Sequence, residues 1–215
     1  MIDLHTHTFF SDGVLIPSEL VYRAKVKGYR AIAITDHGDF SNLDLIIPRI
    51  LNVSQILSSS YDIAVLPGVE LTYVPPALME KAVKLSRKLG AKIVVIHGET
   101  PVETVPPGTN RAGLQSGADI LAHPGYITEQ EVKLAKKCNV CLEITTRHGH
   151  NKTNPHVVSL AKEFGARLIL NTDSHTPEDL LTVTKLRETL KSSGLSMKDY
   201  KTMLNNSNKL IERRK

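Results

Sequence analysis

Short apolar runs alternate with longer segments that carry helix start and stop signals along the whole 215-residue chain. The apolar runs are rich in β-branched residues, which is typical of strands covered on both faces. Proline, glycine and capping residues mark the ends of the segments between them. The predicted strands are 2–7, 30–35, 63–69, 92–96, 119–122, 140–145 and 166–171, and the predicted helices are 17–27, 42–58, 76–89, 111–116, 128–137, 154–164, 177–191 and 197–213.

Alternation of strands and helices predicts an α/β fold whose strands run parallel, in an open sheet or a closed barrel. Polar residues follow nearly every predicted strand, which favours a barrel, because barrel sites lie at the C-terminal ends of the strands. Pro67-Gly68 is expected to interrupt the strand 63–69. The proline- and glycine-rich segment 98–110 is expected to be a functional or mobile loop. The length suits one domain, 1–215, made of a barrel (1–192) and a basic C-terminal helix (196–215).

Composition excludes several classes of protein. There is no apolar run long enough to span a membrane and no signal-peptide pattern, so we expect a cytoplasmic protein. Cys138 and Cys141 lack the second pair that a zinc knuckle needs, and we expect reduced thiols. Of the net charge of +5, residues 196–215 carry +4, from six Lys or Arg against two acids. The body is therefore not a basic surface, and a nucleic-acid partner is disfavoured except through that helix.

The first thirteen residues contain the clearest chemical signal. His5 and His7 lie two apart on a predicted strand, so both imidazoles point to one face and can bind one metal ion. Asp12, beside Gly13, can fold an oxygen ligand back towards them. Taken alone, the motif fits equally well with two partly exposed histidines on an edge strand.

Most of the other predicted strands also end on histidine or acidic residues. A single histidine in such a position is usually structural, but burying many ionisable groups together is costly unless they are paired or bind metal. Zn²⁺, Mn²⁺ and Fe²⁺ all accept mixed imidazole and carboxylate ligands. The pattern therefore predicts a metal cluster, formed by His5, His7, His37, Glu70, His97, His123, Asp173 and His175.

The order of these motifs resembles the polymerase and histidinol phosphatase (PHP) family. His-x-His with Ser-Asp-Gly is followed by Thr-Asp-His, Pro-Gly-Val-Glu, Ile-His-Gly, Ala-His-Pro-Gly and Thr-Asp-Ser-His, from residue 3 to residue 175. The resemblance implies a distorted seven-stranded, TIM-like (β/α)7 barrel with two to three divalent ions at the C-terminal ends of the strands. It assigns one ion to His5, His7, Glu70 and Asp173, a second to Glu70, His97 and His123, and a third to Asp12, His37 and His175.

Such ions would activate a hydroxide for direct attack on a phosphate ester, without a phosphoenzyme. Glu70 and Asp173 would then act in catalysis through the metals. Arg147 and Arg111 are candidates for binding the phosphate, with solvated surface arginines as the alternative. His150 is a candidate proton donor to the leaving group, or an exposed residue.

Three further acidic residues are candidates for supporting roles. Glu143, inside a predicted strand, and Asp36, beside His37, could each orient a ligand imidazole. Asp3 could instead secure the start of the barrel.

The leading functional hypothesis is a metal-dependent phosphomonoesterase, similar to histidinol phosphatases, acting on a small phosphorylated metabolite. One alternative is a PHP-type nuclease or phosphodiesterase acting on nucleotides or nucleic acid. Another is a non-catalytic RNA-binding barrel that uses the basic helix 196–215. The sequence does not indicate the oligomeric state.

Overall fold

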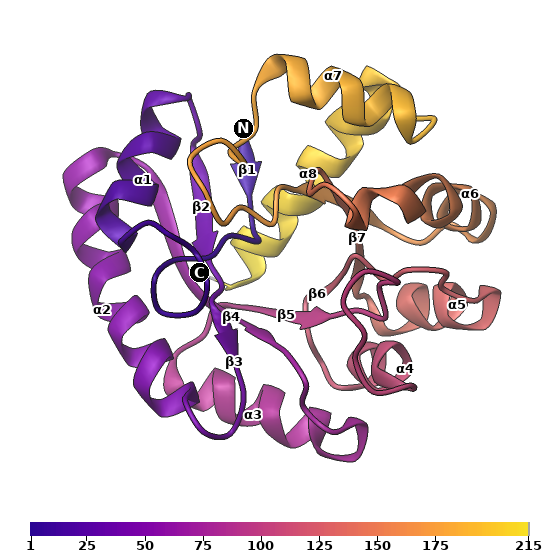
Figure 1. The fold of residues 1–215 in the computed structure, drawn as a ribbon, viewed down its shortest axis with the longest axis horizontal. Coiled ribbons are helices and arrows are strands. Elements are labelled where there is room, and N and C mark those ends of the chain that lie inside the picture. Colours follow the sequence, from indigo (N-terminus) through magenta and orange to yellow (C-terminus); the bar gives the residue numbers. More distant parts are fainter. Residues whose placement is uncertain (215) are drawn as a thin grey trace.

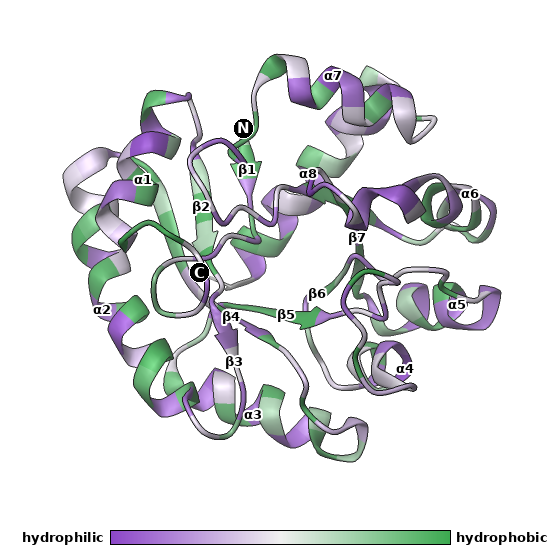
Figure 2. Cartoon of the chain, in the orientation of Figure 1, coloured by the Kyte–Doolittle hydropathy of each residue, from purple (hydrophilic) through white to green (hydrophobic). Residues whose placement is uncertain are grey.

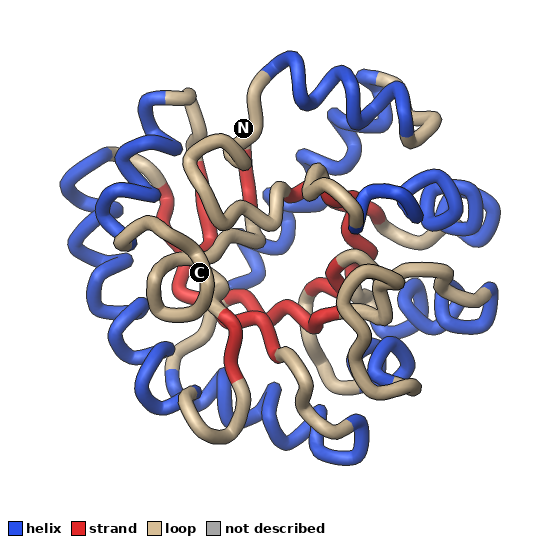
Figure 3. Tube along the Cα trace, in the orientation of Figure 1, coloured by secondary structure: helices blue, strands red, loops and turns tan. Residues whose placement is uncertain are grey.

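A computed structural model describes residues 1–214 and shows parallel strands enclosed by helices (Figure 1). The path β1-β2-β4-β5-β6-β7-β8 forms a nearly closed seven-stranded barrel, and the short β3 pairs with β4 beside it. Figure 3 shows this ring of strands inside the layer of helices. The predicted barrel is therefore confirmed. Its strands are β1 (Ile2–Asp3), β2 (Ala31–Ile34), β3 (His37–Gly38), β4 (Ala64–Leu71), β5 (Ile93–His97), β6 (Ile120–Ala122), β7 (Cys141–Thr145) and β8 (Leu168–Asn171).

The seam of the barrel lies between the first and last strands. Beyond the end of β1, Thr6 forms an isolated parallel bridge with Ser174. The Asp3 carboxylate accepts hydrogen bonds from the Thr172 hydroxyl at 2.6 Å and from the Thr172 backbone N–H at 3.2 Å. Asp3 thus secures the start of the barrel, one of the supporting roles considered for these acids. The strand itself is shorter than the predicted 2–7.

The expected interruption of β4 at Pro67-Gly68 is wrong. The strand continues through both residues, and the Pro67 carbonyl accepts a hydrogen bond from the Lys92 N–H at 2.7 Å. A Cβ on Gly68 would lie 2.8 Å from the Ile93 carbonyl oxygen, so a residue without a side chain is required there. Glu70 is consequently held inside a regular strand.

The helices cover the outside of the barrel. They are α1 (Pro17–Val26), α2 (Leu43–Tyr61), η1 (Pro76–Leu78), α3 (Met79–Leu89), α4 (Thr109–Gln115), α5 (Glu129–Cys138), η2 (His150–Thr153), α6 (Asn154–Phe164), α7 (Val183–Ser192) and α8 (Met197–Arg214). Helix α7 begins later than the predicted residue 177. The Asp179 carboxylate accepts hydrogen bonds from the backbone N–H groups of His175 and Thr176, which fixes a turn instead. Within residues 1–214, no helix is both long and apolar enough to cross a membrane.

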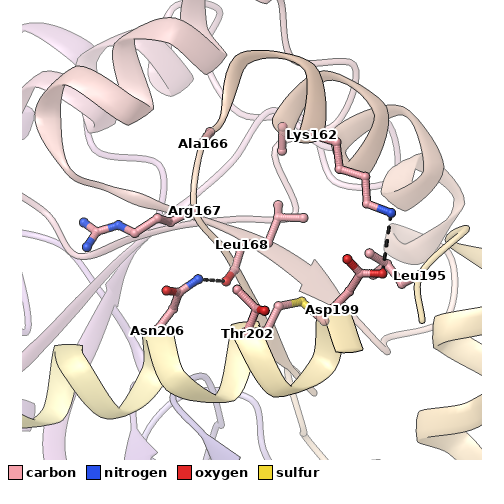
Figure 4. A pocket seen from close by; sticks show the side chains of 10 residues that line it. Lys162, Ala166, Arg167, Leu168, Leu195, Asp199, Thr202 and Asn206 are labelled. Atoms are coloured by element: carbon pink, nitrogen blue, oxygen red, sulfur yellow. Dashed lines mark hydrogen bonds and ion pairs between the residues drawn. The ribbon is translucent and has the colours of Figure 1, made fainter. Parts of the chain in front are cut away.

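Alternating strand residues build two apolar layers. One set packs against the helices, and the other fills the barrel interior. Strands such as β2 and β5 are coloured as hydrophobic in Figure 2. Leu210 and Ile211 of α8 belong to the interior set. Helix α8 also contacts the N-terminal ends of two strands. Arg213 pairs with Asp119, which precedes β6, at 3.3 Å. Asn206 donates a hydrogen bond to the Leu168 carbonyl at 2.9 Å, as Figure 4 shows. The helix therefore covers the N-terminal end of the barrel.

The basic character of α8 lies on its outer side. Lys198, Lys201 and Lys209 are exposed, whereas Met203 faces the barrel and is buried. Residues of α8, α6 and β8 line a cavity of about 210 Å³. The Lys162–Asp199 ion pair lies at its edge, with 3.6 Å between the charged atoms (Figure 4). Helix α8 is thus a packed element of the fold whose lysines point outward.

The two cysteines occupy different environments. Both are free thiols; Cys138 is exposed, and Cys141 is buried in β7. Burial raises the pKa of the Cys141 thiol to about 11, which suppresses its reactive thiolate. We expect a chromogenic disulfide reagent to label one thiol per folded chain at pH 8, and a second after unfolding. Cys138→Ser should abolish the fast reaction, and rapid labelling of two thiols in native protein would contradict this placement.

Candidate metal centre

The C-terminal ends of the strands bring all nine predicted ligands together. They come from the loops after β1, β6 and β8 and from β3, β4 and β5. Ligand atoms within 4.8 Å of one another form four overlapping groups. These are His7, Asp12, His37 and His175; His5, His123 and Asp173; His5, His7 and Glu70; and Glu70, His97 and His123.

Glu70 lies at the middle of the cluster and is fully buried. Its Oε2 is 2.9 Å from His37 Nδ1 and 3.3 Å from His5 Nε2, and its Oε1 is 3.5 Å from His123 Nε2. Neither oxygen has a hydrogen-bond partner. Burial alone would raise the pKa of Glu70, but the charges of His5 and His37 hold it well below its usual value. A buried, ionised carboxylate among imidazole nitrogens fits a bound cation.

Asp173 faces Glu70 across the same histidines. Its Oδ1 lies 3.2 Å from His7 Nε2, and its Oδ2 lies 3.7 Å from His123 Nε2. Both Asp173 and His123 have left-handed backbone conformations, with φ of 54° and 26°. Such conformations cost about 1–3 kcal/mol each in residues other than glycine and occur mostly at functional sites.

Asp12 forms the outer part of the cluster. The loop after β1 folds back, so that Asp12 Oδ2 lies 3.1 Å from His175 Nε2 and 3.6 Å from His37 Nε2. Partial burial opposes ionisation of Asp12, but the hydrogen bonds from His175 and His37 hold its pKa far below the usual value. The family resemblance assigns these three residues, Asp12, His37 and His175, to a third ion.

The chain is similar to proteins of one family along most of its length. The PHP domain pattern matches residues 3–170. The chain belongs to the PHP domain family. Uncharacterized protein MJ1295 of Methanocaldococcus jannaschii is 46% identical, with 98% of both chains covered. The probable phosphatase TTE1963 of Caldanaerobacter subterraneus subsp. tengcongensis is 28% identical over 81% of this chain and 76% of its own.

Two solved structures share the fold of this PHP protein. A chain of an archaeal ribonuclease P with mature tRNA superposes with a TM-score of 0.74 at 20% identity, covering 100% of this chain and 91% of its own. Histidinol phosphate phosphatase of Lactococcus lactis, complexed with zinc, L-histidinol and phosphate, gives a TM-score of 0.62 at 19% identity, with coverage of 91% and 94%.

Other residues of the PHP protein contact the rings of the predicted ligands. Glu143 Oε2 lies 2.8 Å from His5 Nδ1 and accepts a hydrogen bond from the Asn171 amide at 2.8 Å. The contact with Glu143 therefore engages His5 Nδ1, and the other ring nitrogen, Nε2, faces Glu70. This contact matches the orienting role predicted for Glu143.

Asp36 has a different role from the one predicted. Its carboxylate accepts hydrogen bonds from the Thr8 N–H and hydroxyl, both at 2.7 Å, and from the Ser11 hydroxyl at 2.8 Å. It thus organises the loop that carries Asp12. The Thr72 hydroxyl lies 2.7 Å from His37 Nδ1, beside the Glu70 carboxylate, and is the supporting group that contacts the His37 ring.

Substituting Glu143 tests its orienting role. Glu143→Gln keeps the shape of the side chain and removes its charge, and we expect the affinity for divalent metal to fall about 10–100-fold, as is usual when a partner of a ligating histidine is changed. Competition with a chromophoric chelator measures this affinity. Glu163→Gln, an exposed change on α6, is the matched control. Equal affinities of wild type and Glu143→Gln would contradict the role.

Arg147 lies at the edge of the cluster. Its guanidinium contacts His175 Nδ1 at 2.6 Å and donates to the Asp173 carbonyl at 3.2 Å. Arg111 is not brought to the cluster. Because α4 begins at Thr109, Arg111 lies exposed on a helix, in a groove with Thr128, Gln130, Glu131 and Leu134.

His150 is buried at the start of η2, so the alternative that it is an exposed residue is wrong, and its role as a proton donor stays a prediction. Its ring centroid lies 4.5 Å from that of His123, and burial lowers its pKa to about 4.

Sequence reasoning missed Glu103, which lies in the predicted loop 98–110. Glu103 Oε2 is 3.2 Å from His97 Nε2, and its Oε1 is 3.6 Å from His150 Nε2. The hydrogen bond with His97 lowers the pKa of Glu103 to about 2. No motif marks this residue, and the length of the loop was its only signal.

An open cavity of about 540 Å³ adjoins the cluster. It is lined by Asp12, His37, Gly38, Asp39, Ser41, Asn42, Thr72, Tyr73 and Glu103. No lysine or arginine is among these residues.

Proposed function

We propose that this PHP protein is a metal-dependent phosphomonoesterase that acts on a small phosphorylated metabolite. The observation that carries the proposal is Glu70, whose two buried oxygens lie 2.9–3.5 Å from imidazole nitrogens and have no hydrogen-bond partner. The probable phosphatase TTE1963 supports the same class of reaction.

The proposed ligands are those that the resemblance implies. His5, His7, Glu70 and Asp173 would hold one ion; Glu70, His97 and His123 a second; and Asp12, His37 and His175 a third. When bound, divalent ions of this kind supply a hydroxide nucleophile near neutral pH and neutralise the charge of the phosphate. Zn²⁺, Mn²⁺ and Fe²⁺ all suit the donor set, and zinc is present in the Lactococcus lactis structure.

Arg147 is the guanidinium that we propose binds the phosphate. It is three-quarters buried, and its fork of N–H donors matches two phosphate oxygens. Arg147→Ala should raise KM for an aryl phosphate about tenfold because a phosphate contact is lost, and unchanged metal content would show that His175 and Asp173, which Arg147 also contacts, still bind metal. Steady-state kinetics and elemental analysis measure both quantities. The exposed Arg111→Ala serves as the control, and an unchanged KM in Arg147→Ala would contradict the assignment.

The cavity favours a small substrate. Its volume lies in the range of small-molecule sites, at about 300–1,000 Å³. Lysine and arginine neutralise the phosphate backbone in nucleic-acid sites, and neither is among the residues that line this cavity.

A second candidate function is RNA binding. The higher of the two reported TM-scores, 0.74, is to the archaeal ribonuclease P chain, and the exposed lysines of α8 offer a cationic surface. A PHP-type nuclease would use the same metal cluster on nucleotides or nucleic acid instead of a phosphorylated metabolite. RNA affinity that falls steeply with salt and survives chelation would favour a non-catalytic RNA-binding role.

Metal analysis combined with hydrolysis of a generic aryl phosphate tests the proposal. We expect about two to three ions per chain and turnover that is abolished by chelator and by His7→Ala. If well-folded protein has no bound metal and no metal-stimulated turnover, the enzyme proposal is wrong. The RNA-binding function of the α8 lysines would then be the one to test.

A further inference from the structure

We propose that Glu103 is an additional metal ligand, carried by the loop 98–110 to the ion that Glu70, His97 and His123 would hold. The inference rests on the proposed metal centre and goes beyond its ligand set. The loop passes over the C-terminal face from the end of β5 to the start of α4. Among its residues, Glu103 is the acid whose carboxylate reaches a predicted ligand.

The contact involves the ligating nitrogen of His97. His97 Nδ1 lies 3.1 Å from the Gly98 carbonyl oxygen, which can only accept, so Nδ1 would keep its proton while a metal ion takes the place of the Nε2 proton that Glu103 contacts. Glu103 Oε2 lies 3.2 Å from that Nε2. Two ligands bound to one ion at about 2.1 Å each are at most about 4.2 Å apart, so both atoms can reach the same ion.

The loop is anchored at its two ends. Asn110 accepts a hydrogen bond from the Glu99 N–H at 2.9 Å and donates one to the Pro124 carbonyl at 2.9 Å. Glu99 Oε1 in turn accepts from the N–H groups of Gly108 and Asn110. The tip, residues 101–104, is exposed. These anchors keep Glu103 near the cluster while its exposed tip leaves the carboxylate free to adjust.

The remaining ligands leave room for a fourth. Glu70, His97 and His123 offer three donor atoms, and Glu70 is shared with a neighbouring group. Four-coordination is usual for zinc, and a fourth ligand that can be replaced suits a catalytic ion. Glu103 is half exposed and lines the cavity, so a substrate oxygen can take its place.

Cobalt titration of metal-free protein tests the assignment without turnover. Co²⁺ is added to wild type, Glu103→Gln and Asp39→Asn, while visible absorption reports coordination and chelator competition reports affinity. Asp39 is the matched control, because it lines the same cavity and its carboxylate binds Ser41 instead of a histidine. We expect Glu103→Gln to change the spectrum and weaken one ion at least about tenfold, and Asp39→Asn to match wild type.

The outcomes separate this inference from the proposed function. If wild type binds Co²⁺ and Glu103→Gln gives the same spectrum and affinity, Glu103 is not a ligand, and the proposed phosphatase function is unaffected. Wild-type protein that binds no Co²⁺ or Mn²⁺ would overturn both. A spectral change confined to Glu103→Gln would support the ligand even if aryl phosphates were not hydrolysed.

Discussion

Replacing Glu70 with glutamine is expected to lower aryl phosphate hydrolysis at least about 10³-fold, equivalent to about 4 kcal/mol of transition-state stabilisation. The reason is its position. Glu70 carries the carboxylate that four ring nitrogens surround at 2.9–3.5 Å. An amide keeps the volume but removes the charge that offsets the divalent ions. Steady-state rates with saturating Mn²⁺ or Zn²⁺ measure the loss.

The same substitution should also abolish stabilisation by metal. A ligand present at 100 times its dissociation constant stabilises a folded protein by about 2.7 kcal/mol, and loss of affinity removes that contribution. Thermal unfolding with and without Mn²⁺ reports it independently of turnover. Glu80→Gln, an exposed change on α3, should behave as wild type. Full activity together with a normal metal-dependent rise in Tm in Glu70→Gln would refute the central role of this carboxylate.

The barrel and the gathering of the cluster were predictable from sequence for one physical reason. Apolar runs mark where parallel strands end, and all such ends meet at one face of a barrel. His37, Glu70 and His97 could thus be placed together although they are far apart in the chain. The ligand roles of these residues remain proposals.

Features set by individual side-chain contacts could not be predicted in this way. Glu103 reaches His97 from a loop without periodicity, and no spacing rule covers such a contact. Arg111 was considered a phosphate-binding residue at the start of the predicted helix 111–116, but it lies exposed on α4 and is not brought to the cluster. The continuity of β4 depends on the close approach of Gly68 to Ile93 of the next strand, which no local signal reveals.

The basic C-terminal segment, residues 196–215, is another case in which composition predicts only part of the structure. Its charge suggested a solvated helix or a partner-binding surface, and its lysines do point outward. Its apolar side, however, closes the barrel. Leu210 is 2% exposed and Ile211 is 8% exposed, and both lie with interior residues such as Ile93 and Ile120. We therefore propose that residues 1–192 and α8 form one folding unit.

Ending the chain at residue 195 is accordingly expected to abolish cooperative unfolding. Removing one large buried apolar side chain costs about 2–5 kcal/mol, so losing Met203, Leu210 and Ile211 together approaches the whole stability of a domain, about 5–15 kcal/mol. Leu210→Ala alone should cost about 2–5 kcal/mol, and the exposed neighbour Lys209→Ala should stay within about 0.5 kcal/mol. Urea unfolding followed by circular dichroism measures all three. A truncated chain with the wild-type midpoint would mean that the barrel is stable without its terminal helix, and that α8 is an appendage available to a partner.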